Sequence, residues 1–253
     1  MKKILSILPI IIALLCCTNC KHPKLPAPDP IPQKDSVKQK DTHTDTLHIA
    51  PDTETEATMR ALGLVDIQEI DPTIQVHLVY STPDNFTHTI LYKDIHKAFM
   101  LPVVAEKLKR AQAQLKAQHP DYSLLVYDAA RPLSVQWDMW EVAKATNTTY
   151  YVADPRKAQG LHNYGAAVDI TIVDGRGDPI SMGTPFDWFG VEAHITHEDS
   201  LVRSGAISQQ ELDNRLLLRK LMTDNGMLTI RSEWWHYELM RGPEAQATLK
   251  IVE

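Results

Sequence analysis

Histidine and carboxylate residues suited to binding a metal ion occur at two places in the chain. At the first, His162 precedes Asp169 by seven residues, with Gly165 between them. Asp169 interrupts the apolar run Ala166–Val173 (AAVDITIV), which the pattern predicts to be a buried strand. A carboxylate in such a strand is costly unless a partner compensates its charge. The sequence therefore predicts a cationic partner for Asp169.

The second place is the stretch Glu233-Trp-Trp-His236-Tyr-Glu238. Two histidines and one carboxylate, His162, Asp169 and His236, suit zinc, whose fourth tetrahedral position then takes a water molecule. Glu233 is placed to act as general base on that water. Residues three apart in a regular strand face opposite sides, so Glu233 must lie on a turn or bulge before the strand of His236. From the residues alone, chance spacing among eleven histidines and an aromatic-rich core strand stay open as alternatives.

Composition and charge restrict the class of protein. The chain has 253 residues, of which 43% are hydrophobic and 23% charged, as is ordinary for a globular protein. This length allows one domain with a sizeable core, or two small ones. The formal net charge is −6 and no basic block stands out, so we expect no nucleic-acid partner. The sequence does not indicate an oligomeric state.

Residues 1–20 are typical of an export signal. Two lysines precede an apolar run from Ile4 to Leu15, which is short for a membrane span; a short membrane anchor is the alternative. All three cysteines of the chain, Cys16, Cys17 and Cys20, follow this run. This arrangement resembles a bacterial lipoprotein site, at which Cys17 or Cys20 would be acylated. We therefore expect an exported protein on the periplasmic or outer-surface face of a bacterial membrane, attached to it only through that lipid.

The segment after the signal differs in composition from the rest of the chain. Residues 21–56 carry six of the sixteen prolines and show no hydrophobic period. This composition predicts an extended, disordered linker that holds a domain away from the membrane. The globular domain is expected over residues 57–253.

The predicted domain mixes strands and helices. Strands are expected at Ile74–Tyr80, Ser123–Tyr127, Ala166–Val173, Met227–Ile230 and Trp234–Leu239. Helices are expected at Pro102–Gln118, at Ser134–Lys144, and from a capping-box pattern at Ser208 through Leu221. The turn sequence Asp174–Asp178 (DGRGD) is expected to fold the chain back after the strand of Asp169. Neighbouring late strands, with helices grouped before and between them, predict an α+β fold whose central, mostly antiparallel sheet is flanked by helices.

Several stretches occur in an order that matches a known pattern. The two metal stretches are His162-Asn-Tyr-Gly165-Ala-Ala167-Val-Asp169 and, downstream, Glu233-Trp-Trp-His236. Three more are Tyr80–Phe86 (YSTPDNF) with Leu91-Tyr92, Val126–Pro132 (VYDAARP) and Met182–Phe189 (MGTPFDWF). Together they resemble the zinc D-alanyl-D-alanine dipeptidases, which are related to the D,D- and L,D-carboxypeptidases. The resemblance covers the chain from Ala57 to Arg241.

The resemblance implies the fold of the D-Ala-D-Ala and hedgehog-like zinc peptidases, with one zinc ion per chain. His162, Asp169 and His236 would bind the zinc ion. Glu233 would be the general base, and Arg131 would stabilise the negative oxygen of the tetrahedral intermediate. A further set would hold the termini of a small D-amino-acid dipeptide: Tyr80, Tyr92 and Asp187.

One position departs from the family pattern. Members commonly carry a serine two residues before the first histidine ligand, where this chain has Gly160. The change bears on the substrate contacts and not on the zinc chemistry. His194 and His197 form a His-x2-His pair, for which the resemblance implies no ligand role, so we expect a helical or surface role.

The function implied by the resemblance is zinc-dependent hydrolysis of the D-Ala-D-Ala dipeptide outside the cytoplasm. One alternative is a carboxypeptidase that trims larger peptidoglycan peptides, which needs an open groove where a dipeptidase needs a small closed pocket. The other alternative is a non-catalytic, wall-binding lipoprotein. The presence of all three ligand residues together with Glu233 and Arg131 argues against this last reading.

Overall fold

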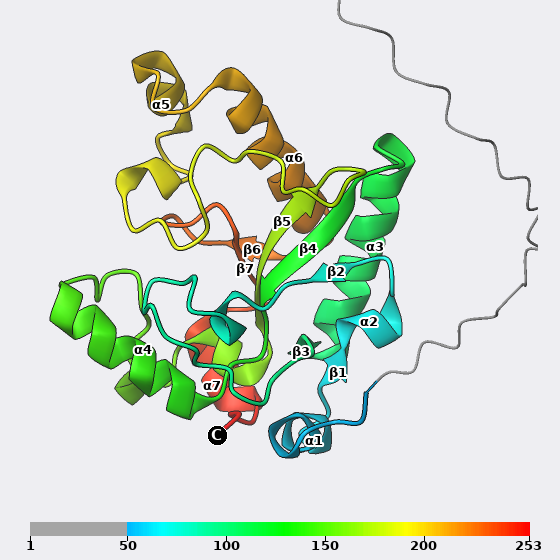
Figure 1. Cartoon of the computed structure of the whole chain (residues 1–253), viewed down its shortest axis with the longest axis vertical. Helices are drawn as coiled ribbons and strands as arrows, with labels where there is room; N and C mark the ends of the chain where they lie inside the picture. Colours follow the sequence, from blue (N-terminus) through cyan, green and yellow to red (C-terminus); the bar gives the residue numbers. More distant parts are fainter. Residues whose placement is uncertain (1–49) are drawn as a thin grey trace, which may run out of the picture. The chain divides into compact units, whose positions relative to one another are not determined.

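The computed structural model describes residues 50–253 (Figure 1). The predicted export signal, its cysteines and most of the predicted linker lie outside the described residues. The described part contains seven α-helices: α1 (Glu54–Ala61), α2 (Ile67–Ile70), α3 (Pro102–Gln118), α4 (Leu133–Thr146), α5 (Glu198–Ser204), α6 (Gln209–Asp224) and α7 (Gly242–Thr248). None of these helices combines the length and the apolar character that a membrane span requires.

A five-stranded sheet in the order β2-β4-β5-β7-β6 forms the centre of the fold. Only β2 and β4 run parallel, and the other neighbours are antiparallel. Strands β1 and β3 form a separate antiparallel pair. The strands are β1 (Val65–Asp66), β2 (Gln75–Val76), β3 (Phe99–Met100), β4 (Ser123–Asp128), β5 (Ala167–Val173), β6 (Leu228–Thr229) and β7 (His236–Glu238). The predicted α+β fold with a mostly antiparallel sheet is confirmed.

Helices α3 and α6 pack against each other and against the sheet, α3 at β4 and α6 at β6 (Figure 1). Helix α3 begins with Pro102, and its buried residues recur at helical spacing at Val104, Leu108, Ala111 and Leu115. They share one hydrophobic core with alternate residues of β5, namely Val168, Ile170 and Ile172. All seven residues of β5 are buried, because both faces of this strand are covered. Asp169 therefore lies on the face of β5 opposite to the helical layer.

Helix α4 lies near the beginning of β5 (Figure 1). The chain before α4 is joined to the chain before β5 by a hydrogen bond from Arg131 N to His162 O of 3.0 Å. Short 3-10 helices complete the description: η1 (Val79–Ser81), η2 (Pro155–Lys157), η3 (Leu161–Tyr164) and η4 (Val191–Ala193). This end of the sheet carries the residues that the sequence singles out.

Most predicted elements are present, with some changes of extent. Helix α3 has the predicted bounds, and the predicted capping box at the start of α6 is formed between Ser208 and Glu211. The turn after β5 is also present, with a hydrogen bond from Gly177 N to Asp174 O, and an isolated bridge follows between Val173 and Pro179. Because local caps and turn residues specify these features, the sequence was sufficient to predict them.

The strand predicted at Ile74–Tyr80 is wrong over most of its length. Only Gln75–Val76 pairs with β4, and Val79–Ser81 forms η1. The chain leaves the sheet because Ser81 turns back on Leu78, which accepts hydrogen bonds from both the backbone and the hydroxyl of Ser81. The alternation of apolar residues here reflects burial of Val79 and Tyr80 in a turn, not a strand.

The described domain begins earlier than the predicted boundary at residue 57. Helix α1 starts at Glu54, and Thr53 and Glu56 form a capping box at its N-terminus. Asp52 accepts hydrogen bonds from Arg60 and Lys97. Glu56 is buried, and hydrogen bonds from the backbone of residues 96 and 97 compensate its carboxylate for the lost solvent. These contacts across the domain attach residues that composition alone assigned to the linker.

Candidate metal centre and active site

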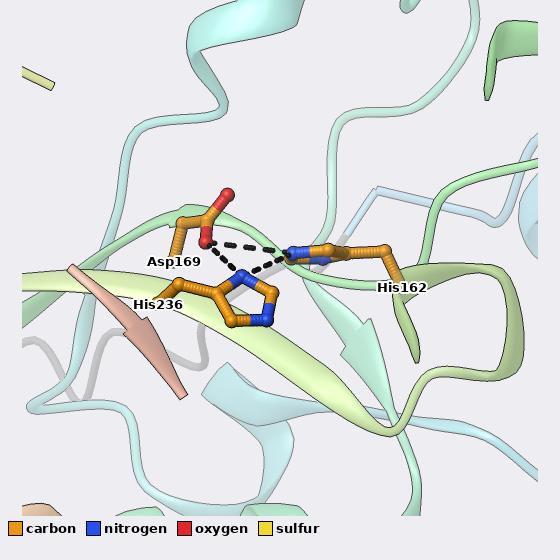
Figure 2. Close-up of side chains that lie close together, drawn as sticks. All are labelled: His162, Asp169 and His236. Atoms are coloured by element: carbon orange, nitrogen blue, oxygen red, sulfur yellow. Dashed lines mark hydrogen bonds and ion pairs between the residues drawn. The ribbon is translucent and has the colours of Figure 1, made fainter. Parts of the chain in front are cut away.

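Three side chains meet at the beginning of β5: His162 from η3, Asp169 from β5 and His236 from β7 (Figure 2). Asp169 Oδ1 lies 2.9 Å from His236 Nδ1 and 3.4 Å from His162 Nε2. The two histidine nitrogens are 3.2 Å apart. All three residues are buried. The predicted ligand residues are therefore brought together, with one donor atom of each facing the other two.

Strand pairing positions two of these ligands. Asp169 and His236 are direct partners in the antiparallel pair of β5 and β7. Direct partners project from the same face of a sheet with Cβ atoms about 4.5–5.5 Å apart. The register of this one strand pair therefore determines that the carboxylate and the imidazole face each other.

A tight turn positions the third ligand. Helix η3 ends at Gly165, whose φ of +63° lies in the left-handed region that favours glycine. A Cβ atom at Gly165 would also lie 2.8 Å from Leu64 Cδ2, so this position is crowded as well as left-handed. The turn returns the chain into β5 and places His162 beside Asp169, as the sequence predicted from Gly165.

The geometry of this trio fits a tetrahedral metal ion. Bonds of about 2.0–2.1 Å to a tetrahedral ion place its ligand atoms about 3.3 Å from one another. The observed separations of 2.9, 3.2 and 3.4 Å are close to that edge length. Within residues 50–253 no other trio of histidine, cysteine or acidic side chains comes together in this way, and His194 and His197 belong to no such group. These three residues form a candidate metal site.

Each histidine makes a second contact that orients its ring. The Nδ1 atom of His162 lies 2.7 Å from Ala129 O, which leaves Nε2 for a metal ion. The Nε2 atom of His236 lies 3.4 Å from Glu238 Oε1, which leaves Nδ1. Glu238 in turn accepts a hydrogen bond of 2.9 Å from Arg241. Carboxylates and carbonyls behind histidine ligands are a common feature of protein metal sites, and they set which nitrogen is available.

Glu233 lies on the loop before β7, as its position three residues before His236 required. Its Oε2 atom is 4.0 Å from His236 Nδ1, and the side chain is 10% exposed. Burial raises the pKa of Glu233 to about 7. Glu233 therefore stands beside the donor trio, with a carboxyl group able to gain and lose a proton near neutral pH.

Arg131 is held by a buried carboxylate beside the trio. Its Nε and Nη2 atoms both donate to Asp128 Oδ2, and Nη2 lies 3.9 Å from Asp169 Oδ2. A bulge in β4 at Tyr127 shifts the register, so Asp128 becomes the strand partner of Asp169. Bulges of this kind redirect side chains next to active sites. Asp128 belongs to the stretch VYDAARP, where no sequence pattern distinguishes it from its neighbours.

The three predicted substrate-binding residues have different positions. Tyr80 donates hydrogen bonds of 3.1 Å to both oxygens of Asp187, and both residues line the cavity beside the trio. Tyr92 does not line this cavity. Its hydroxyl donates a hydrogen bond of 2.6 Å to Asp128, so Tyr92 lies behind Arg131 and supports it. The substrate contact of Tyr92 stays a prediction, whereas the contact that the structure gives its hydroxyl is with Asp128.

Asp187 has an unusual backbone and an unusual environment. Its φ of +59° is left-handed, a strained conformation for a residue other than glycine. Burial, together with the charge of Asp169, raises the pKa of the Asp187 carboxyl group well above its usual range. A carboxyl group held in this way is suited to pairing with a cationic ligand group.

The cavity that these residues line has a volume of about 240 Å³. The segment between α4 and β5 forms much of its wall, including Tyr151, Ala153 and Gly160. A Cβ atom at Gly160 would lie 2.9 Å from Asn163 Oδ1 and 3.3 Å from Ala153 Cβ. The φ of Gly160 is −71°, so contact with these two side chains, and not backbone conformation, accounts for glycine at this position.

The comparisons with known proteins agree with this geometry. A family model described as D-ala-D-ala dipeptidase, of the Peptidase_M15 group, matches residues 60–252. The chain belongs to this family. A family member from Escherichia coli (strain K12), named D-alanyl-D-alanine dipeptidase, is 32% identical over 180 residues, which cover 70% of this chain and 84% of the relative. A member of the same name from Enterococcus faecalis is 28% identical over 197 residues, covering 72% of this chain and 93% of the relative. Family membership identifies the chain as a metallopeptidase of the dipeptidase type.

Proposed function

We propose that this protein hydrolyses the D-Ala-D-Ala dipeptide with a zinc ion held by His162, Asp169 and His236. The observation that carries the proposal is the convergence of their three donor atoms on a small cavity that Glu233 and Arg131 also line. The name shared by the relatives from E. coli and E. faecalis supports the choice of substrate. Two imidazoles and one carboxylate form a donor set that suits zinc and leaves one tetrahedral position open.

Glu233 would transfer the proton from the attacking water to the leaving amine. A zinc ion bound at this site would act as a Lewis acid that polarises the substrate carbonyl and acidifies water. Glu233 accepts a proton from the attacking water and delivers it to the leaving amine. A pKa near 7 suits both steps, because general acid–base catalysis is most effective when the pKa lies close to the working pH.

Arg131 would stabilise the charge that develops on the substrate. Its guanidinium group is buried and lies beside Asp169, on the cavity wall. When the carbonyl carbon becomes tetrahedral, its oxygen becomes negative, and a positive charge already in place there needs no reorganisation. Asp128 keeps the guanidinium at this position.

Asp187 and Tyr80 would bind the ammonium group of the dipeptide. The Asp187 carboxyl group has a raised pKa, and an ammonium group beside it would favour its ionised form. Aromatic side chains enclose the same cavity, among them Phe86, Tyr151 and Phe189. The cavity has a volume of only about 240 Å³, a size that favours a dipeptide over a longer cell-wall peptide.

The test is a product analysis of the purified zinc-loaded protein with three substrates: D-Ala-D-Ala, L-Ala-L-Ala and a wall pentapeptide ending in D-Ala-D-Ala. We expect free D-alanine from the first and little reaction with the other two. Faster release of D-alanine from the pentapeptide would show a carboxypeptidase. Absence of hydrolysis of D-Ala-D-Ala by protein with stoichiometric zinc would refute the proposed function.

The N-terminal segment would place this activity outside the cytoplasm, with the chain attached to a membrane through Cys17 or Cys20. The motivation is the position of the cysteines after an export-signal pattern. Fractionation of cells that make the protein tests this location. We expect the wild type in the membrane fraction and the doubly substituted protein, Cys17→Ser with Cys20→Ser, in the soluble fraction. An unchanged membrane fraction would contradict lipid attachment.

A further inference from the structure

Arg131 makes a second side-chain contact, with Gln136 of α4. The Nη1 atom of Arg131 donates a hydrogen bond of 2.8 Å to Gln136 Oε1. A guanidinium group has five N–H donors. Asp128 takes one from Nε and one from Nη2, and Gln136 takes one from Nη1. Among the contacts of residues 50–253, one N–H therefore remains on each of Nη1 and Nη2, and Arg131 is one of the residues that line the cavity.

Asp128 holds the guanidinium group of Arg131 from one side only, through Nε and Nη2. Both hydrogen bonds from Arg131 to Asp128 end on the single atom Oδ2, so they restrain the tilt of the planar group within its own plane only weakly. The ring of Tyr80, 5.2 Å from Arg131 Cζ, restrains motion out of the plane but not within it. Gln136 accepts a hydrogen bond from the other terminal nitrogen, Nη1. This second point of contact restrains the tilt that Asp128 leaves open.

The orientation of the Gln136 amide is determined by its two partners. The side chain is 1% exposed. Its Nε2 atom donates a hydrogen bond of 2.9 Å to Ala153 O, in the segment that forms the cavity wall. A guanidinium can only donate and a carbonyl can only accept, so the amide oxygen must face Arg131 and the amide nitrogen must face Ala153.

We propose that Gln136 is a positioning residue for hydrolysis, which directs the two remaining Nη hydrogens of Arg131 toward the substrate oxygen. This inference rests on the proposed function and concerns the rate of its chemical step. The hydrogen bond to Ala153 orients Gln136, so one side chain links the cavity wall to Arg131. Loss of the hydrogen bond between Gln136 and Arg131 should weaken binding of the transition state more than binding of the substrate, because the negative oxygen forms only in the transition state.

The chain offers a matched control for this test. Gln112 of α3 is also 1% exposed, accepts a hydrogen bond from Leu124 N (2.8 Å) and donates one to Thr73 O (3.0 Å). Gln112 is not among the residues that line the cavity. Gln136→Met removes a buried amide with two hydrogen bonds, and Gln112→Met removes one with three, the third being to Thr73 Oγ1 (2.9 Å). The control should therefore lower Tm at least as much as Gln136→Met. Only Gln136→Met should change the kinetics.

The experiment measures kcat, KM, zinc content and Tm of the full-length zinc-loaded protein with D-Ala-D-Ala. For Gln136→Met we expect kcat to fall by about 10- to 100-fold with full zinc and KM within about threefold of wild type, since small misplacements of a catalytic group have effects of this size. Gln136→Glu keeps an acceptor for Arg131 but loses the donor to Ala153, and we expect its kcat to recover to within about tenfold of wild type.

Several results would overturn the inference. They are a wild-type kcat in Gln136→Met, a rise in KM alone, or an equal loss of kcat in Gln112→Met. If Gln136→Met does not fold, Gln136→Glu decides, because a large loss of kcat with normal Tm and zinc content would contradict the positioning role. An inactive wild-type protein with full zinc would instead refute the proposed function, so the two failures are distinguishable.

Discussion

Glu233 and Glu238 stand on either side of His236 in the sequence and contact it at different atoms. Glu233 Oε2 lies 4.0 Å from Nδ1, the nitrogen that faces Asp169. Glu238 Oε1 lies 3.4 Å from Nε2, on the far side of the ring. The first carboxylate therefore lies on the side of the candidate metal site, and the second lies behind the ring of a proposed ligand. Exchanging each for glutamine separates proton transfer from metal binding.

Glu233→Gln should keep zinc and the fold but lose activity. The change removes the proton acceptor, whose contribution is typically about 10²–10⁴-fold in rate. Zinc content and turnover are measured on one preparation. In the wild type we also expect kcat/KM to fall as the pH drops through the pKa of Glu233, which burial raises to about 7 and a zinc dication would lower, because only the ionised carboxylate accepts a proton. Near wild-type turnover in the variant would refute the base assignment.

Glu238→Gln should weaken zinc binding but keep turnover, the opposite of the result expected for Glu233→Gln. Removing the negative charge behind His236 makes the ring a weaker ligand, and losing such a partner typically lowers metal affinity by about 10- to 100-fold. Turnover at saturating zinc should stay close to wild type. Competition with a chromogenic chelator measures the zinc Kd of both variants. An unchanged Kd in Glu238→Gln, or a weakened one in Glu233→Gln, would reverse the roles assigned here.

At the scale of elements, the turn between η3 and β5 is the connection on which the site depends most. Gly165 is left-handed, and a Cβ atom at this position would overlap the side chain of Leu64. Gly205, at the end of α5, is also left-handed, with φ +76°, but has open space where a Cβ atom would lie. These two glycines separate the effect of backbone conformation from that of close packing.

Gly165→Ala should therefore destabilise the protein more than Gly205→Ala. A left-handed alanine costs about 1–2 kcal/mol at either site. At Gly165 the overlap with Leu64 adds about 1–3 kcal/mol, typical of overpacking in a core. The shifted turn should also displace His162 and weaken zinc binding. Denaturant unfolding and zinc titration of both variants provide the check, and equal free energies of unfolding would show that packing at Gly165 is not limiting.

At the scale of the whole molecule, the candidate metal site joins segments that are brought together only by folding. His162, Asp169 and His236 come from η3, β5 and β7. Asp128 and Asp169 place buried carboxylates beside Arg131, and Glu233 adds a third buried carboxyl group beside His236. A bound dication would offset this excess of acidic groups. A ligand that binds only the folded state stabilises that state in proportion to the logarithm of its concentration over Kd.

Removal of zinc by a chelator should therefore lower Tm. At free zinc of 1,000 times Kd the stabilisation is about 4 kcal/mol, on the order of 10 °C for a domain of this size. His162→Ala should lose the response of Tm to zinc, whereas His194→Ala should keep it, since His194 belongs to no donor group in the described residues. Thermal scans with and without chelator test this. A wild-type Tm that is the same with and without zinc would contradict the proposed metal site.

The sequence by itself determined the features that depend on local pattern. The period of apolar residues and the caps predicted α3 and α6, and Gly165 predicted the turn that returns His162 to Asp169. The order of the motifs predicted the family, which the match over residues 60–252 confirms. Such signals are local because a cap, a turn or a helical face is specified by residues within one or two turns of the chain.

Only the tertiary structure decided how the groups behind these residues are arranged. The bulge at Tyr127 makes Asp128 the strand partner of Asp169, and Tyr92 donates its hydroxyl to Asp128, a contact that no sequence pattern indicates. Gln136 is a partner of Arg131 because α4 and the segment of Ala153 pack beside the guanidinium group, an arrangement that only the tertiary structure specifies. Strand register, bulges and contacts between distant segments depend on the packing of the entire chain, so the residues that support the site leave no local pattern in the sequence.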